Sequence, residues 1–450
     1  MKVDILNLEW ASSGRDREMA TLVNFALRKK GYRVREASIF DWRHELLKYD
    51  PKLLFITNSN GAKINFRVVK FAKQHGYSVV TLTSEGNLEE IDIEISVWGR
   101  NTDRKLYEDI TCYWTKRAKE ICLSNFPDLD RKKIKVTGAA GFDRYKIYRF
   151  MSKNEFLDRY NKNYKKIVGV AGWGFDHFDK KFSLYETYEN IYGKKQCQTF
   201  RSDRLLLNEI YEKLIKNNRS VLFLLKEHPG VINKHKSELH GLDQYDNVVY
   251  IKSEEKISNC ISPCDIWIAY ESTTCLEAWL LGKETFYVNP SGPDFQRRRI
   301  YLGHPVFETY KEAQNALNAY YERGSIPEFK ARKDLRKKII SDVIQWDDGK
   351  NHMRAAYFIE KILKEADTNK LNRYSLKEKF DSYVNHILYI GAIIPGIRNL
   401  PRFKKYKYNR RMFKSNQLKK LTKEYQPFWE RFFETNPLTI DDKREIINIS

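Results

Sequence analysis

The sequence lacks the cysteine patterns of a disulfide framework or a zinc site. Its 450 residues include six cysteines, with no CxxC pair and no cluster with histidines. In a chain of this length, scattered single cysteines favour a reducing compartment. We therefore expect a cytoplasmic protein that needs neither disulfides nor zinc.

Long apolar runs are also missing. The longest late in the chain, Ile387 to Ile397, is interrupted by Pro395 and Gly396 and is shorter than the roughly 20 residues that span a bilayer. The run Met1 to Trp10 contains Asp4, which indicates a first β-strand rather than a signal peptide. These features predict no membrane span and no export signal.

Negative charge is missing from one segment. Residues 398–423 contain eleven Lys and Arg residues and no Asp or Glu. This block holds half of the net charge of +22. It calls for an anionic partner or free solvation. Phe403, Tyr406, Tyr408 and Phe413 interleave with the cations, which suits the headgroup region of a membrane. The sequence thus predicts a peripheral protein held to the anionic inner face of the plasma membrane through residues 398–423.

Two other interpretations of the basic block remain. It could pack on the protein itself as a solvated basic face. Nucleic acid is the other anionic partner, but the charge lies outside the predicted domains and no nucleic-acid-binding motif accompanies it. We expect no nucleic-acid partner.

The apolar pattern predicts an α/β protein with two Rossmann-like domains and a helical, basic C-terminal extension. Short β-prone runs alternate with amphipathic stretches, which indicates parallel, doubly wound sheets. The expected domains are residues 1–150, residues 165–345 and a tail of residues 346–450, with a polar linker at 150–166. The predicted strands are Val3–Leu8, Tyr32–Ile39, Leu53–Thr57, Ser78–Leu82, Ile134–Val136, Ile167–Ala171, Val221–Leu225, Val248–Ile251, Ile266–Ala269 and Thr285–Val288.

Three hydroxyl residues follow a predicted buried strand in the second domain. Ser272, Thr273 and Thr274 stand between the strand and a helix start, where free backbone N–H groups and the helix dipole attract anions. One hydroxyl alone would be an ordinary helix cap. Three at the carboxyl edge of a parallel strand indicate a phosphate site.

The strand Val221–Leu225 leads into Lys226-Glu-His228-Pro-Gly230 on the same sheet edge. There His228 could donate a hydrogen bond or a proton to a leaving phosphate, and Lys226 could bind it. A lone loop histidine is more often structural, and its place beside the hydroxyl residues is what favours the functional interpretation.

Further candidates flank these motifs. Gly172 and Gly174 follow the first strand of the second domain and would let a nucleotide approach the backbone. Glu255, next to Glu254, could reach a ribose. In the first domain, Glu85 follows the strand Ser78–Leu82 and could deprotonate an acceptor hydroxyl, with Asp16 and Glu9 as replacements. Each of these could equally be an ordinary loop residue.

The order of these motifs resembles a bacterial family of surface-carbohydrate biosynthesis proteins. The motifs are Glu85-Gly86, Trp98-Gly99, Val136-Thr-Gly138 with Phe142-Asp143, His228-Pro229 and Ser272-Thr-Thr274. More distantly, the order is similar to GT-B sialyltransferases and Kdo transferases, which share an acidic residue followed by Gly, a His-Pro pair and a Ser/Thr pair. The GT-B architecture has two Rossmann-like domains facing across a cleft.

The resemblance implies an inverting, metal-independent glycosyltransferase. It would move a sugar, by implication a CMP-activated acidic sugar, to a cell-surface polysaccharide or glycolipid, with Glu85 as base and His228 assisting the departing phosphate. No DxD motif stands at a strand end, so no metal and no cofactor are expected. Ser84 replaces the first of the paired acids usual in sialyltransferases. The same spacing also resembles glycerol- or ribitol-phosphate transferases with a CDP-linked donor. A non-catalytic or nucleic-acid-binding protein is the further alternative.

Overall fold

The computed structural model describes residues 2–12, 14–179, 185–231, 234–292, 299–366, 374–392 and 394–450. The chain forms two compact units. One contains both ends of the chain, Met1–Tyr148 and Ser341–Ser450, and the other is Arg149–Ile340. The segment 346–450, which the sequence predicts as a separate tail, therefore groups with the first unit.

The first unit is built on a six-stranded parallel sheet in the order β2-β1-β3-β4-β5-β6. Nearly every strand residue is buried, as helices on both faces of a parallel sheet require. The strands are β1 (Ile5–Glu9), β2 (Val34–Ser38), β3 (Leu53–Ile56), β4 (Ser78–Leu82), β5 (Ile110–Tyr113) and β6 (Ile134–Val136). The pattern-based prediction missed β5.

The helices of the first unit come from both ends of the chain. The N-terminal part supplies α1 (Arg15–Lys29), α2 (Trp42–Tyr49), α3 (Lys63–Gln74), α4 (Ile93–Val97), α5 (Lys116–Asn125) and α6 (Arg144–Ile147). The C-terminal part supplies α15 (Asn351–Glu365), α16 (Leu376–Gly391), α17 (Pro401–Met412), α18 (Ser415–Thr435) and α19 (Ile440–Ile449). The C-terminal extension is helical, as the sequence predicts, and the basic block lies in α17, in α18 and in the residues that flank them.

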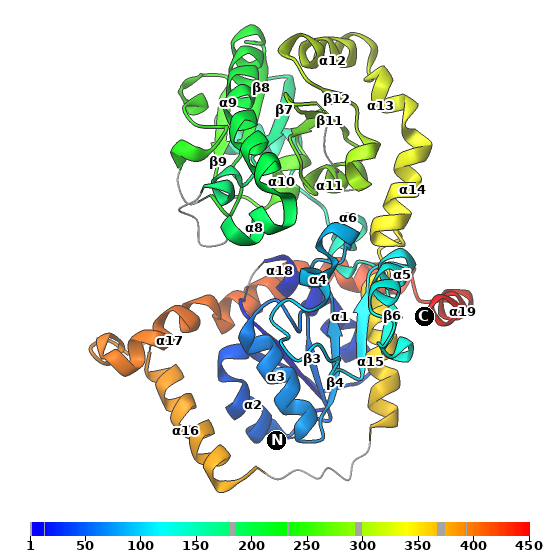
Figure 1. Ribbon diagram of the computed structural model, residues 1–450, viewed down its shortest axis with the longest axis vertical. Helices are drawn as coiled ribbons and strands as arrows, with labels where there is room; N and C mark the ends of the chain where they lie inside the picture. The colour runs from blue at the N-terminus through cyan, green and yellow to red at the C-terminus, as the bar shows by residue number, and fades with distance from the viewer. Residues whose placement is uncertain are drawn as a thin grey trace. The chain divides into compact units, whose positions relative to one another are not determined.

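Helix α15 completes the core of the first unit. Its Ala355 and Ile359 are fully buried in one cluster with Val23 and Leu27 of α1 and with Phe55 of β3. Figure 1 shows α15, in yellow, beside the strands of this unit although the two are distant in sequence. The first core therefore needs residues from both ends of the chain.

The second unit has a six-stranded parallel sheet in the order β12-β11-β10-β7-β8-β9. Counted within the unit, this is the 6-5-4-1-2-3 order of Rossmann sheets, with its reversal point between β7 and β10. The strands are β7 (Lys166–Ala171), β8 (Val221–Lys226), β9 (Val248–Ile251), β10 (Ile266–Ala269), β11 (Glu284–Val288) and β12 (Val306–Phe307). The short β12 was not predicted.

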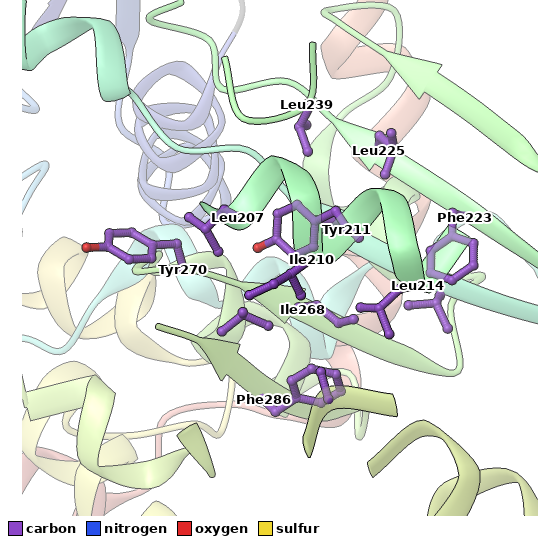
Figure 2. Close-up of a cluster of buried hydrophobic side chains, with 14 of the residues drawn as sticks. Leu207, Ile210, Tyr211, Leu214, Phe223, Leu225, Leu239, Ile268, Tyr270 and Phe286 are labelled. Atoms are coloured by element: carbon purple, nitrogen blue, oxygen red, sulfur yellow. The ribbon is translucent and has the colours of Figure 1, made fainter. Parts of the chain in front are cut away.

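Helices flank this second sheet. They are α7 (Lys153–Arg159), α8 (Tyr185–Tyr192), α9 (Lys194–Asn217), α10 (Ile257–Ile261), α11 (Thr274–Leu280), α12 (Tyr310–Arg323), α13 (Pro327–Ala331) and α14 (Lys333–Ile344), the last containing the boundary between the units. Figure 2 shows Leu207, Ile210, Tyr211 and Leu214 of α9 packed on Phe223, Ile268 and Phe286 of the strands. This cluster holds α9 against the sheet, and the carboxyl edge of that sheet carries the predicted site.

The segment 150–166 is not an extended linker. It contains α7, which begins with a reciprocal capping box between Ser152 and Glu155. Phe156 of this helix is fully buried in the second unit's core with Trp267. The polar composition that suggested a linker belongs to the exposed face of a short helix.

None of the described helices is both long and apolar enough to cross a bilayer.

Asp143 joins the two chain segments of the first unit. Its carboxylate accepts hydrogen bonds from Asn351 Nδ2 (2.8 Å), from the His352 backbone N–H (2.7 Å) and from His352 Nδ1 (2.8 Å). The Asp143 side chain is fully buried, so losing it would leave three buried donors without their acceptor.

We expect Asp143→Ala to lower the free energy of unfolding of the first unit by about 3 kcal/mol or more. The matched control is Asp441→Ala, since that side chain is 90% exposed and lies in the same unit; surface changes of this kind stay within about 0.5 kcal/mol. Urea denaturation measures both. Equal midpoints for the two variants would show that this buried cluster does not hold the segments together.

Candidate functional site

The loops after β7, β8, β10 and β11 meet at one edge of the second sheet, because parallel strands all point the same way. The chain leaves β7 and β10 toward opposite sides of the sheet, and such a reversal point is where open α/β sheets bind ligands. The rings of Trp173 and Tyr270, one from each loop, lie 5.3 Å apart. Tyr270 also donates a hydrogen bond to the buried Asp203 Oδ2 of α9 (2.5 Å). The predicted glycine and hydroxyl motifs thus lie at one site.

Glycines in these loops give room to two histidine rings. A Cβ on Gly174 would lie 2.9 Å from Cε1 of His177 and 3.2 Å from Nδ1 of His228. A Cβ on Gly230 would lie 2.8 Å from His177 Nε2. A Cβ on Gly172 would crowd the backbone N of His228 at 3.1 Å. The glycines are therefore required by close packing between the loops after β7 and β8.

His228 is held as a neutral imidazole with a defined tautomer. The Gly230 N–H donates to His228 Nδ1 (3.1 Å), so the ring proton of the neutral form lies on Nε2. Burial, together with the nearby His177, lowers the pKa of His228 to about 4. At neutral pH this residue is a hydrogen-bond donor through Nε2 and not a cation.

Lys226 does not offer a free ammonium to an anion. Its Nζ donates to the carbonyl oxygen of Glu227 (3.0 Å) and to that of Lys252. Burial lowers its pKa. The side chain thus links the ends of β8 and β9, and its predicted contact with substrate would need these bonds to break.

The three hydroxyl residues have different surroundings. Ser272 Oγ accepts from the Thr274 N–H (3.2 Å) and from Thr274 Oγ1 (3.0 Å), while Trp267 Nε1 donates to Thr274 Oγ1 (2.9 Å). Both lone pairs of Ser272 Oγ therefore accept, and its O–H is left to donate. Thr273 is exposed. Ser272 and Thr273 can bind a ligand, and Thr274 positions the turn.

Glu255 lies at the end of the β9 loop and is buried. Its Oε1 forms an ion pair with Arg159 of α7. Neighbouring Glu254 instead caps its own loop, accepting from the N–H groups of Lys252 (2.7 Å) and Ser253 (3.0 Å). The pairing fixes the Glu255 carboxylate, and its contact with a ribose stays a prediction.

Sequence reasoning missed two residues of this edge. His177 stands three residues after Gly174 and crosses His228 edge-on, with ring centroids 5.7 Å apart. Glu238 is fully buried and accepts from the Trp173 N–H (2.6 Å). Burial raises its pKa to about 8. The only signal for His177 was its place in the loop, and the sequence around Glu238 carried none.

The first unit has its own cluster at the carboxyl edge of its sheet. Glu85 has a largely exposed side chain and forms an ion pair with Arg15, at the start of α1. Arg15 Nη2 also donates to the Ser84 carbonyl (3.2 Å). Gly86 is needed next to Glu85, because a Cβ there would lie 2.3 Å from the Trp114 ring. As a base, Glu85 would have to leave its guanidinium partner.

Asp16 belongs to the same cluster, and Glu9 lies deeper. Burial raises the pKa of Asp16, against the attraction of Arg15, and the charge of Glu85 raises it further. Burial also raises the pKa of Glu9, to about 7. Glu9, however, accepts from Thr57 Oγ1 (2.7 Å), which ties β1 to the end of β3, and from Asn7 Nδ2 (2.9 Å) of its own strand. Asp16, half-buried, is therefore the better placed of the two replacement bases.

Within the described ranges, no group of three or more His, Cys, Asp or Glu side chains is arranged to hold a metal ion.

A scan against protein-family models finds no match, and a search of curated proteins finds none. Solved structures do match. A protein named as a UDP-N-acetylglucosamine 2-epimerase from Listeria monocytogenes has a TM-score of 0.54 at 12% identity, over 82% of this chain and 98% of its own. The S. aureus MnaA structure with UDP has 0.54 at 14%, over 83% and 100%.

A further UDP-N-acetylglucosamine 2-epimerase has a TM-score of 0.53 at 13% identity, over 83% of this chain and 99% of its own. At such identities the likeness shows the fold. The chain has the α/β fold of the GT-B class, built from two Rossmann-like units, as the sequence predicts.

The low pKa of His228 predicts an acid-dependent loss of stability. Below about pH 6.5 the unfolded chain protonates this imidazole, whereas the folded chain does so only near pH 4. Stability should therefore fall as pH drops through this window, because the unfolded state binds more protons. In His228→Gln we expect a smaller fall than in wild type, while the exposed His240→Gln should behave as wild type. Chemical denaturation between pH 7 and 4 measures this; identical profiles for wild type and His228→Gln would contradict it.

Proposed function

We propose that this protein is an enzyme acting on a nucleotide-activated sugar, and within that class an inverting glycosyltransferase of cell-surface polysaccharide or glycolipid synthesis. The observation that carries the proposal is the neutral His228, whose Nε2–H donor is held among glycine loops beside the sheet's reversal point. The fold supports the class, since two proteins with this fold are named as UDP-N-acetylglucosamine 2-epimerases and a third is described with UDP. Fold alone does not decide the reaction.

On the donor side, the nucleotide phosphate would lie between the loops of Gly172 to Gly174 and Ser272 to Thr273. Backbone approach over the glycines and the O–H groups of Ser272 and Thr273 would bind its oxygens. His228 Nε2 would donate to the leaving oxygen. A bound phosphate dianion raises the pKa of a neighbouring imidazole, so His228 gains proton affinity only when the donor is present.

On the acceptor side, a carboxylate of the first unit would remove the proton of the acceptor hydroxyl. The acceptor oxygen attacks the anomeric carbon, the bond from that carbon to the phosphate oxygen breaks, and its electron pair stays on the phosphate. Glu85, the base expected from sequence, is exposed but paired with Arg15. Burial raises the pKa of Asp16, which is the direction that makes a carboxylate a stronger base. Glu85 and Asp16 lie in the same cluster, and mutating each of them separately shows which one acts as the base.

The nucleobase of the donor and the group that is transferred have to be identified separately. The sequence resemblance favours a CMP-linked acidic sugar, and a CDP-linked polyol phosphate is its rival. The fold relatives named above are linked by their names to UDP. An epimerase acting on a UDP-sugar is therefore a second candidate, favoured by those fold relatives. NMR of a nucleotide sugar incubated without acceptor distinguishes them, because only an epimerase inverts a sugar carbon with no transfer partner.

We expect a nucleotide to raise the thermal stability of the second unit, by about 2.7 kcal/mol at a hundredfold excess over its Kd. The panel is UDP, CMP, CDP and GDP. Gly174→Ala should lower the affinity for the nucleotide that stabilises wild type by about tenfold, because the new Cβ displaces the His177 ring that packs on His228. The control is Gly141→Ala, whose Cβ would meet its nearest neighbour at an ordinary 3.4 Å. A protein indifferent to all four nucleotides would overturn the proposed class.

We expect His228→Ala to reduce turnover by about a hundredfold while leaving the fold intact, as for loss of one charge-stabilising donor. Asp16→Asn or Glu85→Gln, whichever removes the base, should abolish transfer yet preserve nucleotide affinity. The readout is release of free nucleotide in the presence of acceptor, with the thermal shift as the binding control. If Glu85→Gln and Asp16→Asn both retain wild-type turnover, the base lies elsewhere.

A further inference from the structure

Helix α16 turns an apolar face to solvent. Leu376, Phe380, Tyr383, Ile387 and Ile390 are exposed by 86, 68, 57, 58 and 41%. They recur every three or four residues, which places them on one side of the helix. Ile394, Ile397 and Leu400 extend the exposed series toward α17 at 45, 38 and 53%. These eight residues are called the apolar row below.

Polar contacts beside the apolar row and on the far side of α16 fasten the helix to the first unit. His386 Nδ1 lies 2.7 Å from Asp41 Oδ2, and Glu378 Oε1 lies 3.1 Å from His75 Nε2. The His386 ring stacks on His44 with centroids 3.5 Å apart. A surface helix ordinarily buries its apolar side and exposes its polar side. Here the contacts fix the reverse orientation, so the apolar row is presented outward by the fold.

The exposed charges around the apolar row have one sign. In residues 374–392 and 394–404, every exposed charged side chain is a cation: Lys377, Lys379, Arg398, Arg402 and Lys404. The acids Glu378 and Asp381 are half-buried. Glu378 is bound to His75 as described, and Asp381 interacts electrostatically with Arg43. The surface thus combines an apolar strip with cationic borders.

The aromatic residues of the basic block do not share this exposed surface. Phe413 is buried, with the Arg17 guanidinium 5.1 Å from its ring centre. Tyr406 donates to Asn385 Oδ1 (2.7 Å), and the Phe403 ring packs against Gly391. The side chain of Tyr408 lies outside the described residues. The expectation that Phe403, Tyr406 and Phe413 lie at headgroup level therefore needs correction, because they bind α17 to the rest of the unit.

We propose that the surface formed by α16 and the start of α17 binds an anionic lipid bilayer, with the apolar row in the headgroup and acyl boundary and the cations on the headgroups. Such amphipathic helices lie in the membrane plane and gain from both burial and charge. A second copy of the chain is a poorer occupant, since a two-fold contact would bring the same cations face to face. This inference concerns where the enzyme works and does not depend on the proposed reaction.

A fluorescent label on the apolar row tests insertion directly. All six native cysteines are buried, so a thiol dye reacts selectively with Ile387→Cys. The matched control is Ser124→Cys, exposed on α5 of the same unit. With vesicles containing phosphatidylserine, the label at 387 should shift to shorter wavelength and become accessible to quenchers within the bilayer. The label at 124 should not. Equal spectra at both sites would overturn the proposal.

Vesicle flotation then separates the two parts of the surface. Full-length Phe380→Gln, Ile387→Gln, Ile390→Gln should bind anionic vesicles at least about tenfold more weakly than wild type, since three interfacial side chains lose their burial. Arg402→Gln, Lys404→Gln should lose about fivefold per charge, and high salt should mimic that loss. The control removes three exposed apolar residues elsewhere, as Leu205→Gln, Leu302→Gln, Leu335→Gln, and should float as wild type.

Three results would contradict the proposal. The first is wild-type flotation of the triple α16 variant, and the second is equal binding of wild type to neutral and anionic vesicles. The third is a wild-type dimer in sedimentation that becomes monomeric in the triple α16 variant without any flotation, which would assign the apolar row to a second copy of the chain. Circular dichroism of each variant confirms that exposed positions were changed without loss of fold.

Discussion

The direction of the strands is the constraint on which the rest of the molecule depends. In each sheet all six strands are parallel, so every strand ends at the same edge and every following loop starts there. In the second unit the chain departs from β7 and β10 to opposite sides. The loops that carry Gly172, His228 and Ser272 all start at this edge, at or next to the reversal point. The placement of these residues is thus a consequence of the topology.

Burial at that edge changes what the polar groups can do. The imidazole of His228 and the carboxyl group of Glu238 are both shifted toward their neutral forms, with pKa values of about 4 and about 8. In its neutral form His228 keeps an N–H donor on Nε2. In the proposed reaction a nucleotide phosphate would bring the charge to this edge, and the proton affinity of His228 would then depend on whether the phosphate is bound.

Most strands could be predicted from the sequence because each is a short apolar run, bounded by a glycine or by a stretch with the apolar period of a helix. Strand β5 (Ile110–Tyr113) could not, since its four residues follow an irregular polar stretch and only pairing with β4 and β6 defines them. The sequence also identified Lys226 and Glu85 by charge and position. It could not reveal their partners. The carbonyl oxygen of Lys252 accepts a hydrogen bond from the Lys226 ammonium, and Arg15 pairs with the Glu85 carboxylate, 70 positions away. The apolar residues of α16 recur at a helical period, but periodicity alone does not tell a face turned inward from one turned outward.

Having both chain ends in one unit has a consequence for synthesis. The strands β1 to β6 are synthesised first, but the apolar side chains of α1 and β3 are fully packed only when Ala355 and Ile359 of α15 are present. All of Arg149–Ile340 is translated in between, which takes about 10 to 40 seconds at ~5–20 residues per second. During this interval the second unit can complete its own core, while the six strands of the first unit still lack the α15 part of their core. We therefore expect the second unit to finish folding before the first, and the uncovered apolar side chains of the first unit to be the part of the nascent chain most exposed to aggregation.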